Sequence, residues 1–325
     1  MTAAASTRRG FLAGAVASAA VPALARGQAP AAPPPGLIPA RRQIVRRGRA
    51  IAAGTSGRRL VVAHDRRRTV ALLTPSRNRS RLVDVGGQPL EVAVSPDSRL
   101  AAVTTAFWDE PGLVIVDLLK GAVRTRVDVG PAPFGVMFTP DNRRLVVSGG
   151  EQEGTVHVLD TRRFAVKARE PIGTVPRALA PAPDGRTAWV ALNGMARVAR
   201  VDLRTGRTTR TLHTAALPDR IAVSPDGRRL LVSHGGPDAE YVSEIVIASG
   251  RVRRHRTGHL PSAVAWTARG RRLVLLSGTG ELVVLGRRGA RGRRRVGGVP
   301  RGLAVAGERV WTVDAVTGAV RGLRP

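Results

Sequence analysis

Pro89, followed by Glu91-Val-Ala-Val-Ser-Pro-Asp-Ser-Arg99, opens a phrase that recurs along this chain. The same apolar run and polar turn return in three clear copies and two weaker ones, which begin at Pro133, Pro176, Pro218, Pro261 and Pro300. The leading prolines lie 44, 43, 42, 43 and 39 residues apart. Self-similarity at such a period indicates an array built from one supersecondary unit.

Each unit contains the signals of four short strands, as residues 177–214 illustrate. Strands are expected at 178–182, 187–192, 197–203 and 207–213, separated by turns rich in Gly, Asp and Pro. Asp97, Asp141, Asp184 and Asp226 occupy the first turn of four units, and we interpret them as turn formers because aspartate bonds its own backbone. No long apolar pattern with a 3.6-residue period follows the N-terminus, so helix content should be minimal.

Four short strands in each unit are typical of a propeller, so we predict an all-β, seven-bladed β-propeller of four-stranded blades. First strands should begin near residues 50, 91, 135, 178, 220, 263 and 302. The seventh unit ends after its third strand, 319–323, and a strand-like segment at 43–46 precedes the first unit. We expect this N-terminal strand to close the seventh blade and so remove an exposed edge. An unclosed β-solenoid is the alternative.

The N-terminus has the features of an export signal. Arg8 and Arg9 precede an alanine-rich apolar stretch that ends in Ala23-Leu-Ala25, a small-residue cleavage site. The arginine pair resembles the twin-arginine motif, although a chance pair in an arginine-rich chain is the alternative. We predict a twin-arginine signal peptide at 1–25, a disordered leader rich in Pro and Ala at 26–41, and the propeller at 42–325. The stretch is too short to span a membrane, and the predicted location is the periplasm.

Composition limits the classes of function. The chain has no cysteine, which excludes disulfides, thiolate metal sites and a cysteine nucleophile. Its formal net charge is +30, from 53 Lys and Arg against 23 Asp and Glu, and such a balance favours polyanions. However, the excess is nearly all arginine, which a GC-rich genome also produces. Aromatic residues make up only 3%, so the stacking platforms of single-strand binders are missing.

The expected turns distribute charge unequally between the two faces of the ring. Loops between first and second strands, and between third and fourth, should emerge on one face. That face would carry the arginine clusters at 58–59, 143–144, 162–163, 228–229, 251–256 and 287–295. The other face would carry most of the loop carboxylates, including Asp65, Asp109, Glu110, Asp219 and Asp314. We therefore predict one strongly basic face and one mixed face.

Sequence motifs of hydrolases, metalloproteases, phosphate-binding loops and calcium loops are missing, so we predict no catalytic residue, metal site or cofactor. His64 and His234 each follow a second strand and could serve as a base or ligand. They lie four units apart, so they should not be neighbours. A lone loop histidine of this kind is expected to be solvated.

A stronger candidate site lies at the links between blades, where the mouth of the central tunnel is expected. Arg177, Arg220 and Arg301 follow their prolines by one or two residues, and Asp219 and His259 join them. Longer loops at the same rim add Trp108 and His234. Arginines, an aromatic ring and carboxylates around a mouth suit a small-molecule ligand. Alternatively, each arginine pairs with an acidic residue of the next blade.

The repeated phrase, with third strands such as Ile115-Val-Asp117 and Val158-Leu-Asp160, resembles the YVTN-repeat β-propellers of the YncE-like family. The resemblance covers residues from about 43 to 323 and implies the fold. A sister group is the propeller-type lactonases similar to 6-phosphogluconolactonase. The Tyr-Val-Thr-Asn signature is replaced here, for example by Leu145-Val-Val-Ser148, so the resemblance assigns no functional residue to this chain.

Three functions remain open. The leading hypothesis is a monomeric periplasmic binding or scaffold module, with an unknown protein or small molecule as partner and a polyanion as a further partner of the arginine-rich face. A lactonase-type hydrolase would need His64 or His234 beside a carboxylate and an arginine in one deep pocket. An electrostatic binder of nucleic acid or another polyanion would need a continuous arginine surface.

Overall fold

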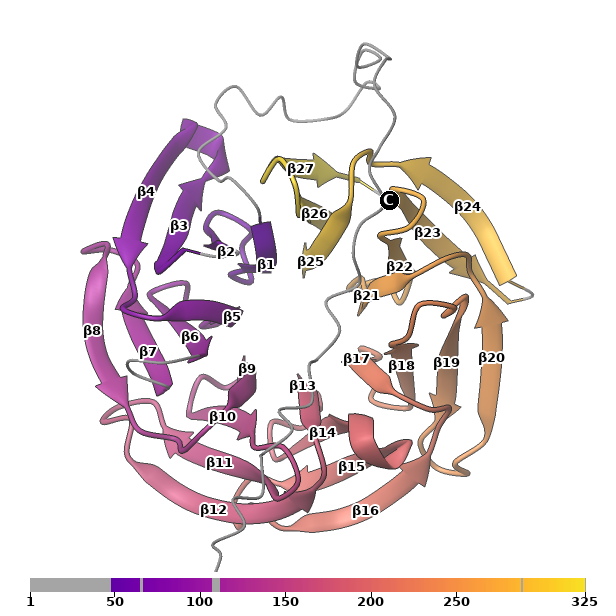
Figure 1. Ribbon diagram of the computed structural model, residues 1–325, viewed down its shortest axis with the longest axis horizontal. Helices are drawn as coiled ribbons and strands as arrows, with labels where there is room; N and C mark the ends of the chain where they lie inside the picture. The colour runs from indigo at the N-terminus through magenta and orange to yellow at the C-terminus, as the bar shows by residue number, and fades with distance from the viewer. Residues whose placement is uncertain (1–47, 65–66, 107–111, 288, 325) are drawn as a thin grey trace, which may run out of the picture. The chain divides into compact units, whose positions relative to one another are not determined.

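The computed structural model describes residues 48–64, 67–106, 112–287 and 289–324. These residues form seven antiparallel sheets, six of four strands and one of three, arranged as blades around a central axis (Figure 1). In every blade the strands pair in chain order, with the first strand nearest the axis. The prediction of an all-β seven-bladed propeller is therefore confirmed. The described residues contain no α-helix and no helix able to span a membrane.

The blades have the following bounds. Blade 1 is β1 (Gly48–Ala53), β2 (Leu60–His64), β3 (Thr69–Thr74) and β4 (Arg79–Asp84), with the 3₁₀ turn η1 (Pro75–Arg77). Blade 2 is β5 (Gln88–Val94), β6 (Leu100–Ala106), β7 (Gly112–Asp117) and β8 (Ala122–Val127). Blade 3 is β9 (Pro133–Phe138), β10 (Arg144–Gly149), β11 (Gly154–Asp160) and β12 (Val166–Gly173). Blade 4 is β13 (Pro176–Pro181), β14 (Thr187–Leu192), β15 (Arg197–Asp202) and β16 (Thr208–His213), with η2 (Asn193–Met195). Blade 5 is β17 (Pro218–Val223), β18 (Arg229–His234), β19 (Tyr241–Val246) and β20 (Val252–Arg256). Blade 6 is β21 (Pro261–Trp266), β22 (Arg272–Leu276), β23 (Glu281–Gly286) and β24 (Gly289–Arg295). Blade 7 is β25 (Pro300–Ala306), β26 (Arg309–Asp314) and β27 (Val320–Leu323).

The core lies between blades rather than within them. Each of seven hydrophobic clusters combines residues of two neighbouring blades, which is why second strands such as β6 and β14 are buried along their whole length. One cluster joins Trp311 and Val313 of blade 7 to Ile51 and Val62 of blade 1, and β25 packs against β1. The inner ring is thus closed by the same apolar packing that joins every other pair of blades.

The turn aspartates have the role expected of them. Asp97 Oδ1 accepts hydrogen bonds from the Arg99 backbone N–H at 3.1 Å and from the Ser95 hydroxyl at 2.6 Å. Asp141 and Asp226 repeat the pattern with Thr139 and Ser224, and Asp184 also binds backbone N–H groups of its turn.

First strands begin earlier than predicted. β13 starts at Pro176 rather than 178, and β17 at Pro218 rather than 220, because the proline itself pairs with the end of the second strand. The ladder then shifts register and resumes at Leu179 or Ile221. Proline is tolerated as the first residue of a strand, where its missing N–H is not needed. The irregularity re-aims the residues that follow it, which are the predicted site residues.

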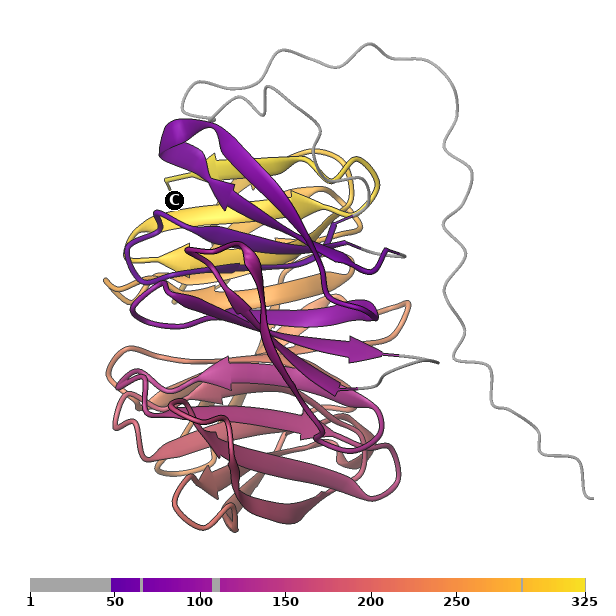
Figure 2. The same cartoon turned by 90° about the vertical axis from the view of Figure 1, so that its left-hand side faces the viewer.

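The assignment of two arginine clusters to loops is wrong. Residues 252–256 form β20 and residues 289–295 form β24, both of which are outer strands. Other outer strands also carry arginines, including Arg79 and Arg81 in β4 and Arg124 and Arg126 in β8. Strands run across the thickness of the ring, so that the turns lie at its two faces and the outer strands form its wall (Figure 2). Basic charge therefore extends along the wall, where charged side chains discourage pairing with other chains.

The third strand expected at the end of the chain is present as β27. The predicted closing strand at 43–46 lies outside the described residues, as do the predicted signal and leader and Trp108. Within the described part of the chain, blade 7 has three strands.

Candidate functional site

The first strands of all seven blades line a cavity of about 200 Å³ on the ring axis. Most of its lining is backbone and small or aliphatic side chains, such as Gly135, Ala178 and Ala263. Glycine at 135 is required by close approach, because a Cβ there would lie 2.3 Å from the carbonyl oxygen of Arg177 in the next blade. Four charged residues also line the cavity, namely Arg49, Glu91, Arg220 and Arg301.

Hydroxyl groups hold three of the first strands, β9, β13 and β25, against the preceding blade. Thr104 Oγ1 donates to the carbonyl of Phe134 at 2.7 Å, and Ser148 Oγ donates to the carbonyl of Arg177 at 2.7 Å. Ser277 repeats this contact with Pro300 at 2.6 Å. Because each bond ends beside the shifted register of a first strand, it fixes the direction of the side chains at the mouth.

An ion pair crosses the axis. Arg220 of blade 5 pairs with Glu91 of blade 2, and its Nε lies 3.6 Å from Asp219 Oδ2. Burial alone would lower the pKa of Arg220, but the two carboxylates outweigh that effect and raise the pKa. Arg220 is therefore ion-paired, as the alternative expected, but not with an acidic residue of the next blade. Its partner Glu91 belongs to a blade on the other side of the ring rather than to the next blade.

Phe134 joins two of the predicted arginines. The guanidinium carbon of Arg177 lies 4.5 Å from the ring centroid of Phe134, and that of Arg220 lies 5.8 Å from it. Both distances are within the range of a cation–π contact. Phe134, Arg177 and Asp219 do not line the cavity themselves, but Phe134 and Asp219 contact Arg220, which does. Phe134 and Arg177 are half-buried, so the aromatic ring and one guanidinium group form a partly desolvated surface beside the mouth.

The remaining predicted residues are less closely connected. Arg301 lines the same cavity and is exposed. His259 is exposed, packs beside Gly278 and is not among the residues that line the cavity. His234 also lies outside that lining, held within blade 5.

The expectation of solvated loop histidines is wrong for His64 and His234. His234 is 3% exposed; its Nδ1 lies 3.0 Å from the carbonyl oxygen of Ala216 and its Nε2 lies 2.8 Å from Ser243 Oγ. His64 is fully buried, with Nδ1 2.6 Å from Thr69 Oγ1. Burial, as the main cause, lowers the pKa of both. Each residue ends a second strand, and its ring contacts a side chain of the third strand of the same blade, Thr69 for His64 and Ser243 for His234. Among the described residues, neither histidine lines the channel cavity, although Asp219 and Arg254 lie within electrostatic range of His234.

Sequence reasoning missed Glu91 and Phe134, although the repeat could have identified both. Glu91 stands two residues after Pro89, as Arg220 stands two after Pro218. Phe134 stands directly after Pro133, as Arg177 follows Pro176. The sequence signal was the equal spacing from the proline of each repeat, because residues at the same position of different first strands lie at the same level along the ring axis.

The comparisons with known proteins agree with this architecture. A search of curated protein sequences found no match. Among solved structures, hydrazine synthase of Kuenenia stuttgartiensis is similar with a TM-score of 0.78 at 20% identity, over 87% of this chain and 96% of that chain. Identity this low indicates a shared fold alone. The family model for the YNCE-like beta-propeller matches residues 49–271. The chain therefore belongs to the YNCE-like β-propeller family.

Proposed function

We propose that this protein is an exported binding module that holds a small anionic molecule at the mouth of its central channel. The observation that carries the proposal is that the arginines at the mouth differ in whether a carboxylate neutralises them. Arg220 is already neutralised by Glu91 and Asp219, whereas Arg177 lies against Phe134 and Arg301 is exposed to the mouth. The arginine pair before the apolar N-terminal stretch supports export, which would put the proposed activity in the periplasm.

The three parts would act together. The guanidinium groups of Arg177 and Arg301 present planar donors that match a carboxylate or phosphate. Phe134 offers an apolar surface to the rest of the ligand. The Glu91–Arg220 pair crosses the cavity and occupies its centre, so the ligand would remain at the mouth.

Isothermal titration with a panel of small carboxylates and phosphate esters tests the proposal. Arg177→Gln and Arg301→Gln should each weaken binding of the best anion by about tenfold, the loss expected for one charge-assisted contact. Arg186→Gln is the matched control, because Arg186 is exposed in the same blade as Arg177 but at the β13–β14 turn. Equal losses in all three variants, or no anion bound at millimolar concentration, would contradict the mouth site.

The outer wall favours a second function, attraction of polyanions. Arg253 and Arg254 of β20 are exposed on that wall, as are Arg291 and Arg295 of β24. If these residues neutralise phosphates, the logarithm of affinity should fall with the logarithm of salt concentration by about 0.9 for each phosphate contacted. Arg253→Gln with Arg254→Gln should flatten this slope for duplex DNA, whereas Arg177→Gln should leave it unchanged. An affinity independent of salt would refute this function.

A further inference from the structure

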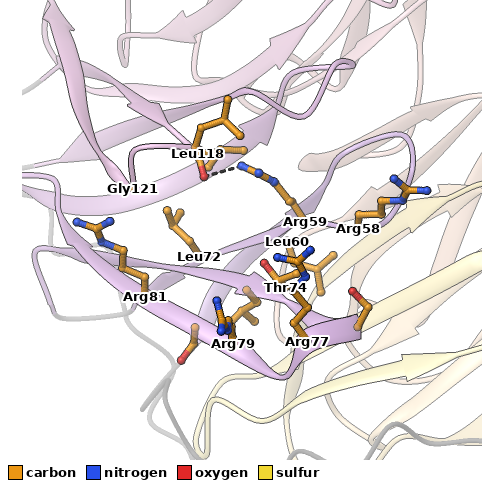
Figure 3. Close-up of a pocket in the computed structure, with 14 residues that line it drawn as sticks. Arg58, Arg59, Leu60, Leu72, Thr74, Arg77, Arg79, Arg81, Leu118 and Gly121 are labelled. Carbon is orange, nitrogen blue, oxygen red and sulfur yellow. Dashed lines mark hydrogen bonds between the residues drawn. The ribbon is translucent and has the colours of Figure 1, made fainter.

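A second and larger hollow, of about 650 Å³, lies between blades 1 and 2, at the ends of the strands opposite to the channel mouth. Five arginines line it, Arg58, Arg59, Arg77, Arg79 and Arg81, and among the described residues no aspartate or glutamate does. Its size is within the range of small-molecule pockets. Figure 3 shows Leu72 within the hollow and arginine side chains around it.

The neighbouring hollow, between blades 2 and 3, differs from it because its lining contains acidic side chains. It measures about 980 Å³ and is lined by four aspartates and four arginines, so its formal charges balance. The aspartates are Asp97 and Asp117 of blade 2 and Asp141 and Asp160 of blade 3. All four belong to strand turns, in which they accept backbone N–H groups.

Blade 1 lacks both turn aspartates. Its first turn contains Gly54-Thr-Ser-Gly-Arg-Arg59 where the next blade has Asp97, and β3 ends at Thr74 where β7 ends at Asp117. The charged side chains that blade 1 contributes to the hollow are therefore all cations. Among the residues that the structure describes, Arg58, Arg77 and Arg79 form no ion pair.

Two of the arginines are held in position by the adjacent blade. Arg59 Nη1 donates to the carbonyl of Leu118 at 2.5 Å, and Arg81 Nη1 donates to the carbonyl of Lys120 at 2.6 Å. A glycine makes room for the second contact, because a Cβ at Gly121 would lie 2.7 Å from Arg81 Cδ. Each guanidinium group keeps other donors free, so the site is partly preorganised for an anion.

The hollow also has an apolar part. Leu72 is half-buried in its lining and Leu119 is 64% exposed in the same lining, whereas Leu73, which also contributes to the lining, packs against the cluster that joins blades 1 and 7. Bare guanidinium groups favour an oxyanion, whereas exposed leucines favour hydrocarbon. Both are present within one cavity.

We propose that the hollow between blades 1 and 2 binds a phosphate or sulfate monoester carried on an apolar group. The arginines would hold the oxyanion and the leucines would cover the first carbons next to it. The site is separate from the channel mouth, since no residue lines both cavities. The same chemistry occurs in a soluble alkyl phosphate and in an anionic lipid headgroup.

Titration calorimetry with n-octyl phosphate, inorganic phosphate and octanol tests the proposal on the purified protein. Octyl phosphate should bind more tightly than inorganic phosphate, and octanol should not bind. Arg77→Gln with Arg79→Gln should weaken octyl phosphate by at least about tenfold, since two exposed charge-assisted contacts are lost. The matched control is Arg143→Gln with Arg162→Gln, which removes the same charge from the hollow between blades 2 and 3 and should change affinity by less than about twofold.

Two further measurements separate the parts of the proposal. Leu119→Ser should reduce the preference for octyl phosphate over inorganic phosphate while leaving inorganic phosphate binding unchanged. Co-sedimentation with phosphatidylglycerol vesicles distinguishes the two sources of the oxyanion. If the protein sediments with the vesicles and Arg77→Gln with Arg79→Gln abolishes this, the source is a lipid headgroup. If octyl phosphate binds but the protein does not sediment, the source is a soluble ester. Equal binding of octanol, equal weakening by the control pair, or no octyl phosphate binding at millimolar concentration would overturn the proposal. Arg177→Gln should affect none of these readouts, so the result is independent of the channel mouth.

Discussion

Replacement of Glu244 by glutamine should be among the most destabilising polar substitutions in this chain. Glu244 lies on β19, is 4% exposed and is surrounded by donors of two blades. His255 Nε2 donates to it at 2.9 Å, Arg229 Nη1 lies 3.1 Å away and Arg272 Nη1 of blade 6 lies 2.7 Å away. The carboxylate therefore joins blades 5 and 6 through charge-assisted hydrogen bonds.

The pKa of Glu244 sets the expected magnitude. Burial alone would raise it, but the hydrogen bond from His255 and the charges of Arg272 and Arg229 lower it from 4.5 to about 2. Because each pKa unit corresponds to about 1.4 kcal/mol, the ionised form stabilises the folded state by about 3 kcal/mol. Removal of the charge also leaves Arg272 unpaired in a mostly buried position, which agrees with the about 3–5 kcal/mol seen when one partner of a buried pair is lost.

Urea unfolding of the wild type and Glu244→Gln, followed by circular dichroism and tryptophan fluorescence, measures this difference. A depressed pKa means that the stabilisation is complete above about pH 4.5 and is lost as the pH falls towards 2, so the two proteins should converge on acidification. Glu240→Gln is the matched control. Glu240 pairs with Arg256 at 2.7 Å in the same blade, but both side chains are exposed, so its loss should cost less than about 1 kcal/mol.

The reasoning fails if Glu244→Gln unfolds within about 1 kcal/mol of the wild type at pH 7. It also fails if the deficit is the same at pH 7 and pH 3, since the stabilisation would then not depend on the charge. If Glu244→Gln lost no more stability than Glu240→Gln, burial of the Glu244 ion pairs would add nothing to their contribution to the free energy of unfolding.

Three further predictions concern pH, ring closure and export. Burial lowers the pKa of His234, so its contribution to stability is present above about pH 6.5 and decreases on acidification; His234→Gln should flatten the fall in melting temperature between about pH 7.5 and 5. Deletion of residues 41–47 should lower the melting temperature and cause aggregation, whereas deletion of 26–38 should change neither; equal melting of both would reject the closing strand. Arg8→Lys with Arg9→Lys should leave the precursor in the cytoplasm, and normal processing of that variant would exclude twin-arginine export.

Local chemistry explains why the architecture could be predicted from the sequence. The Pro-Asp turns and the apolar second strands lie within one unit and are short-range signals, and their recurrence about every 43 residues identifies the repeat. The expected second strand of blade 4, residues 187–192, coincides with β14. The mouth arginines could also be located, because positions just after each proline share one register around the axis.

Tertiary structure decided which of these positions meet. Glu91 and Arg220 lie in blades 2 and 5, and only closure of the ring brings their side chains together across the axis. His234 ends its strand like a loop residue in sequence, yet its ring is buried against Ala216 and Ser243, which only the folded blade brings beside it. The missing turn aspartates of blade 1 are visible in the sequence, but the convergence of five arginines on one hollow is not. The physical reason is that burial and Coulomb energy depend on distances between blades, whereas the repeat specifies only the conformation within each blade.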